Sequence, residues 1–120
     1  MTVWYKTMVT PLTALVTVEG SYTLVELAGE ADVTGIQALN DLLEAETSKG
    51  PGLLIIEMSA LRYIDSAALH TILRAHVALG KAGGRLALVS PSDAVARVLQ
   101  MTEADRVVPV YASIADAAAG

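Results

Sequence analysis

Residues 53–70 read LLIIEMSALRYIDSAALH, and this stretch decides the fold. The run Leu53–Met58 opens with four consecutive aliphatic residues, which is typical of a strand covered on both faces in the middle of a sheet. We expect a polar loop over 59–65 that leads into a helix beginning near Ser66. A hydroxyl at a helix N-terminus is well placed to carry a phosphate, because free backbone NH groups and the positive end of the helix dipole lie there.

The segments on either side repeat this pattern of strand and helix. Glu19-Gly20-Ser21 is a turn signal between two strand-like runs, which predicts a β-hairpin. After Asp32, which can cap a helix, Val33, Ile36 and Leu39 recur at helical spacing. We therefore predict strands over 12–19, 22–28, 53–58, 85–90 and 107–111, and helices over 33–48, 66–82, 93–101 and 114–119.

Strands separated by helices indicate parallel pairing with right-handed crossovers. The opening hairpin adds an antiparallel pair, so the predicted fold is a single α/β domain over 1–120 with a mixed sheet. The expected order is ββαβαβαβα, with four to five strands and about four helices. Residues 3–9 offer a possible further edge strand, and Pro109 places the last strand at the other edge.

Composition excludes several classes of function. The net charge is −5 and the eight Lys and Arg residues are scattered, so direct binding to nucleic acid is not expected. The chain has no cysteine, which excludes disulfides, thiolate zinc sites and cysteine nucleophiles. It shows neither a secretory leader pattern nor an apolar run of roughly 18 residues. We expect a cytoplasmic protein that does not bind membranes.

The histidines do not predict an enzyme or a metal site. Ser66 and His70 could share a helical face, but Ile64 and Ala68 stand where a nucleophile elbow has glycines. His70 and His76 are six residues apart, which does not suit a shared site on one helix. We expect an exposed His70, a hydrogen-bonded His76 at the boundary of helix and sheet, no catalysis, no metal and no cofactor.

The local sequence leaves two interpretations of Ser66 open. Its hydroxyl could cap the helix by accepting a bond from the NH of Ala68 or Leu69, which is worth about 1 kcal/mol. It could also accept a phosphate, which adds roughly −1.5 to −2 charge beside Asp65. Asp65 is in turn either a turn residue whose carboxylate satisfies local NH groups, or a residue that orients Ser66 or contributes a charge for recognition.

Two further acidic residues join this candidate site by a topological argument. In a sheet of the predicted order, the loop after the second strand could approach the loop that precedes Ser66. That arrangement would place Glu30 and Asp32 beside Ser66. The expectation fails if the two loops lie at opposite ends of the sheet.

Four segments follow one another in a fixed order: Gly29-Glu30-Ala31-Asp32, Leu53–Met58, Tyr63–Leu69, and Gly83-Gly84 followed by Leu86–Ser90. Together they resemble the STAS domains of bacterial anti-sigma factor antagonists. They cover about 12–118, and Tyr63–Leu69 partly matches the family's Asp-Ser-Ser/Thr-Gly-Leu signature. Ala67 replaces the second hydroxyl of that signature, Ala68 replaces its glycine, and His70 replaces a small residue.

This resemblance implies a switch between partners. The unphosphorylated domain would bind an anti-sigma factor that is also a GHKL-type serine kinase, and a sigma factor would be released. Phosphorylation of Ser66 would abolish binding, and a metal-dependent serine phosphatase would restore it. We expect a monomer or weak homodimer with partner contacts from Glu30, Asp32, Tyr63, Asp65, Ala67, Ala68 and His70.

Two other functions remain open at this point. A non-switching scaffold STAS protein in a larger signalling assembly agrees with the altered residues Ala67, Ala68 and His70. A small-ligand sensor for a nucleotide or a lipid agrees with the apolar character of the chain, whose hydrophobic fraction is 53%.

Overall fold

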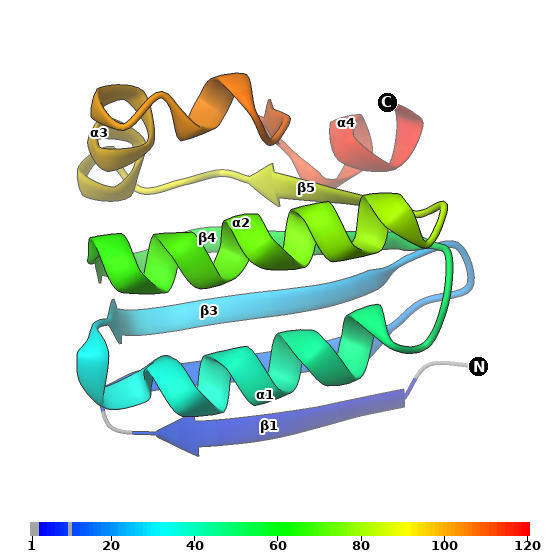
Figure 1. The fold of residues 1–120 in the computed structure, drawn as a ribbon, viewed down its shortest axis with the longest axis horizontal. Helices are drawn as coiled ribbons and strands as arrows, with labels where there is room; N and C mark the ends of the chain where they lie inside the picture. The colour runs from blue at the N-terminus through cyan, green and yellow to red at the C-terminus, as the bar shows by residue number, and fades with distance from the viewer. Residues whose placement is uncertain (1–2, 10) are drawn as a thin grey trace.

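The strands form one mixed sheet in the order β1-β2-β3-β4-β5-β6 (Figure 1). This is a computed structural model that describes residues 3–9 and 11–120, with side chains from Pro11 onward. Antiparallel pairing joins β1, β2 and β3, and parallel pairing joins β3 through β6. The strands are β1 (Val3–Val9), β2 (Leu12–Val18), β3 (Thr23–Ala31), β4 (Leu53–Ile64), β5 (Arg85–Val89) and β6 (Val110–Tyr111).

This architecture confirms the predicted α/β fold. Across the described residues the sheet has six strands rather than four to five, because the possible edge strand over 3–9 does form and pairs with β2. The last strand is shorter than predicted and consists of two residues, although it does lie at the sheet edge. The helices are α1 (Ile36–Thr47), α2 (Ser66–Lys81), α3 (Asp93–Met101) and α4 (Ile114–Ala119), with 3-10 turns at Val33–Gly35 and Ala104–Arg106.

Helices cover both faces of the sheet unequally. In Figure 1, α1 and α2 run side by side over one face. The main core lies beneath them and includes Leu43 of α1, Ile72 of α2 and Leu99 of α3. A smaller cluster on the opposite face packs Ala117 of α4 against Ile55 and Ala87. Burial of each large aliphatic side chain stabilises the fold by roughly 1.5–3 kcal/mol.

β4 is longer than the sequence predicted. It continues through the expected loop 59–65 as far as Ile64, because its second half goes on pairing with β3 through Ala31. Register shifts indicate a bulge in this half, and it breaks the alternation of apolar and polar side chains. Leu61 and Ile64 therefore point into the core at a spacing of three, while the residues between them are exposed.

The first helix begins later than predicted. Asp32 is the expected cap, but it caps a 3-10 turn, and the α-helix itself starts at Ile36. Val33 consequently leaves the apolar stripe and is 73% exposed, contrary to its predicted place in the core. Within residues 3–9 and 11–120, the helices are too short or too polar to cross a membrane.

Candidate functional site

The carboxyl ends of β3 and β4 bring the two predicted loops together. Ala31 pairs with Ile64 in the parallel ladder, and the NH of Asp65 donates a hydrogen bond of 3.0 Å to the carbonyl of Ala31. Parallel neighbours end at the same edge of a sheet, so the residues after Ala31 lie beside the start of α2. This confirms the expected approach of the Asp32 loop to the loop before Ser66.

Gly29 fixes the position of the acidic segment that follows it. Its φ is +96°, and a Cβ added there would overlap the carbonyl oxygen of Pro11. Only glycine combines this conformation with such a close approach. The same carbonyl accepts a hydrogen bond of 3.3 Å from the NH of Glu30. Gly29 therefore anchors this end of β3 on Pro11, the residue directly before β2.

The acidic side chains of this segment have local partners. The Oδ1 atom of Asp32 accepts a bond of 3.0 Å from the NH of Thr34 and a second bond from its hydroxyl. The carboxylate of Glu30 lies 3.8 Å from the guanidinium of Arg62, and both side chains are well exposed. An ion pair of this kind contributes little to stability, so Glu30 is free to exchange partners.

Asp65, rather than Ser66, caps α2. Its Oδ1 atom accepts a hydrogen bond of 2.8 Å from the NH of Ala68, which agrees with the interpretation of Asp65 as a residue that satisfies local donors. This corrects the interpretation of Ser66 as the cap. Ser66 is the first residue of the helix and is exposed, and its hydroxyl forms no hydrogen bond within the described part of the chain.

The first turn of α2 retains free donors near that hydroxyl. The NH of Ala68 is bonded to the side chain of Asp65, and the NH of Leu69 is bonded to the Asp65 carbonyl at 3.0 Å. The NH groups of Ser66 and Ala67 remain, as expected at the start of a helix. A phosphate on Ser66 would therefore meet two NH donors and the positive end of the helix dipole.

The exposed surface around Ser66 differs from the expected set at two positions. Tyr63 is 48% exposed, and Ala67 and His70 are exposed on α2, so these side chains are accessible to a partner. Ala68 is fully buried in the core, because it lies on the inner side of the helix. The prediction that Ala68 contacts a partner is therefore wrong. Val33 was missed, although its position directly after a cap residue could have indicated an exposed first turn.

Neither histidine forms a hydrogen bond with Ser66 or with the other histidine within the described residues. No hydrogen bond joins Ser66 to His70, and within the described residues no three acidic or histidine side chains gather as a cluster that could hold a metal ion. The Nδ1 atom of His76 is buried and has no hydrogen-bond partner among those residues. The prediction that His76 is hydrogen-bonded is wrong for this atom.

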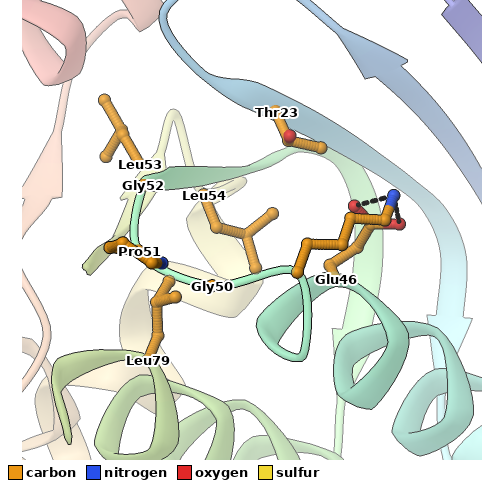
Figure 2. Close-up of a pocket in the computed structure, with 9 residues that line it drawn as sticks. Thr23, Glu46, Gly50, Pro51, Gly52, Leu53, Leu54 and Leu79 are labelled. Atoms are coloured by element: carbon orange, nitrogen blue, oxygen red, sulfur yellow. Dashed lines mark hydrogen bonds and ion pairs between the residues drawn. The ribbon is translucent and has the colours of Figure 1, made fainter. Parts of the chain in front are cut away.

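A separate hollow lies at the opposite end of β4, where the strand begins (Figure 2). Its lining includes Thr23, Glu46 and Leu79, and the Nζ atom of Lys49 lies 3.0 Å from Oε1 of Glu46. The volume of this hollow is about 80 Å³. Ligand pockets usually measure about 300–1,000 Å³, so this hollow does not support a nucleotide site.

Comparisons with known proteins match most of the chain. A family model described as the STAS domain matches residues 13–117. A protein of Thermotoga maritima, provisionally named an anti-sigma factor antagonist, is 37% identical over 70 residues. Those residues are 58% of this chain and 62% of the relative, so the match spans less than two thirds of the relative's length.

Solved structures share the fold. The crystal structure of an anti-sigma factor antagonist from Mycobacterium paratuberculosis has a TM-score of 0.81 and 28% identity, covering 92% of this chain and 95% of that one. The phosphorylated form of the Bacillus cell fate determinant SpoIIAA has a TM-score of 0.65 and 19% identity, with 96% of both chains covered. At that identity the second likeness concerns the fold alone.

Proposed function

Because this chain belongs to the STAS domain family, we propose that it is an anti-sigma factor antagonist whose binding is switched off by phosphorylation of Ser66. The names of its relatives support the general role. One observation carries the switch: Ser66 is exposed at the start of α2 with a free hydroxyl, because Asp65 caps the helix in its place. Phosphorylation would therefore not remove the cap.

The proposed docking surface surrounds this hydroxyl. Glu30, Asp32 and Asp65 give it negative charge, and exposed side chains of Val33, Tyr63, Ala67 and His70 complete it. A partner that fits this surface brings cations to the carboxylates and packs closely against Tyr63. A phosphate would add roughly −1.5 to −2 charge and three oxygens at the centre of that contact. The added oxygens then prevent the partner from packing closely against this surface, and the added negative charge no longer matches the cations that the partner brings.

The proposed partners are those that the resemblance to the family implies. The anti-sigma factor would act as a GHKL-type serine kinase on Ser66, and a metal-dependent serine phosphatase would reverse the modification in the cytoplasm. The chain itself acts as substrate and binding module and carries out no chemistry. A sigma factor is released while the unphosphorylated domain occupies the anti-sigma factor.

A binding measurement with paired variants tests this proposal. Titration calorimetry against the anti-sigma factor should give similar affinities for the wild type and Ser66→Ala, and at least about tenfold weaker binding for Ser66→Asp. Ser21→Asp is the matched control, because Ser21 is exposed in the turn at the far end of β3. Equal affinities for Ser66→Asp and Ser21→Asp would contradict the switch.

The altered signature favours one second candidate, a scaffold STAS protein that does not switch. Ala67 is exposed where the family has a second hydroxyl, and His70 adds bulk to the same surface. Size-exclusion chromatography with light scattering separates the two functions. A switching antagonist should elute as a monomer or weak dimer, whereas a scaffold should elute as a large assembly.

A further inference from the structure

His70 lies one helical turn after the proposed phosphoacceptor. Ser66 and His70 are both exposed on α2, and neither side chain forms a hydrogen bond within the described residues. Residues four apart on a helix have Cβ atoms about 5–6 Å apart. Helical side chains also lean toward the N-terminus, so the imidazole of His70 leans over the turn that carries Ser66.

The nearest charged groups leave a phosphate at Ser66 without a cation. The adjacent Asp65 carboxylate is negative and is already bonded to the NH of Ala68. The end of β3 contributes Glu30 and Asp32, which are also acidic. A phosphate here is therefore surrounded by like charge, which only backbone NH groups and the helix dipole offset.

The other basic side chains of this region lie on another element or farther along α2, and the exposed Arg62 of β4 is held only by a weak surface pair. Arg62 pairs with Glu30. Arg74 lies eight residues after Ser66, which is about 12 Å along a helix, and its Nη2 atom is 3.5 Å from the hydroxyl of Thr71. His70 is thus the side chain on α2 that can supply a positive charge one turn from the phosphate.

We propose that His70 is the intramolecular binding partner of a phosphate on Ser66, with its imidazolium N–H donating to a phosphate oxygen. The proposal rests on the proposed modification of Ser66 and names the residue that holds the added group. The phosphate of a phosphoserine takes its second negative charge near pH 6, so a bond from the His70 imidazolium has its largest effect on the dianion that forms above that pH. A charge-assisted bond between them favours the dianionic phosphate.

The test uses the full chain with phosphoserine inserted at position 66 during translation, so that no kinase is needed. A ³¹P NMR titration from about pH 5 to 8 reports the ionisation of the phosphate itself. With His70 present, the titration midpoint should lie about 0.15–0.4 pH units below that of His70→Gln. The range is that of one surface helix pair, because the titration adds one negative charge to a phosphate that already carries one.

Lys81→Gln is the matched control on the same helix, and it should move the midpoint by less than about 0.1 unit, because position 81 is the last residue of α2 and lies about four turns from Ser66. Far-UV circular dichroism verifies that both variants fold. An unchanged midpoint in His70→Gln, or an equal change in Lys81→Gln, overturns the proposal. Since the phosphate is installed genetically, this outcome is independent of whether any kinase modifies Ser66.

Discussion

Replacement of Gly29 by alanine should strongly destabilise the protein. At a φ of +96°, a residue with a Cβ loses about 1–2 kcal/mol relative to glycine. The new Cβ would also overlap the carbonyl oxygen of Pro11, which is backbone and cannot rotate away. The shift needed to relieve this contact weakens the bond from the NH of Glu30, worth about 1 kcal/mol. Together these effects predict a loss of about 2–4 kcal/mol.

Urea denaturation followed by circular dichroism measures this loss, and two other glycines separate its causes. Gly50 has a φ of +102° with no atom within 4 Å of its added Cβ, so Gly50→Ala should lose only the conformational part, about 1–2 kcal/mol. Gly20 has open space and no positive φ, so Gly20→Ala should lose no stability. The reasoning is refuted if Gly29→Ala is no less stable than Gly50→Ala.

Three further predictions concern caps and exposure, and denaturation midpoints measure each of them. Asp65→Ala should lower the free energy of unfolding by about 1 kcal/mol, because it removes the cap of α2. Ser66→Ala should stay within about 0.5 kcal/mol of the wild type, and the reverse order would show that Ser66 is the cap. Ser92→Ala should lower the free energy of unfolding by about 2 kcal/mol, because the Ser92 hydroxyl caps α3 and also donates a bond of 2.6 Å to the carbonyl of Leu61. A loss below about 0.5 kcal/mol would contradict this dual role. Val33→Ser should change the free energy of unfolding by less than about 0.5 kcal/mol, because the side chain is exposed. A loss above about 2 kcal/mol would show that Val33 is packed in the core.

The order of strands and helices could be predicted because most elements keep one hydrophobic period. Leu39 and Leu43 on α1 and Ile72 and Leu79 on α2 recur at helical spacing, and all four are buried. The second half of β4 could not be predicted in this way. Its bulge depends on pairing with β3, which is distant in sequence, and it changes the spacing of buried residues from two to three.

The candidate site could be predicted in its position but not in its details. Parallel pairing of β3 with β4 places the Asp32 loop beside Ser66, as the topology implied. Asp65 and Ser66 are both favourable cap residues and they are adjacent, so composition does not determine which of them begins the helix. That offset of one residue also determines that Ala68 points inward and that the Ser66 hydroxyl stays free.

The most direct test of the central claim is the mass spectrum of the intact and digested protein after incubation with the anti-sigma factor kinase and ATP. We predict the addition of a single phosphate, located at Ser66, and no addition to Ser66→Ala. A phosphate at another residue, or an unmodified protein that still binds this kinase, would contradict the proposed switch.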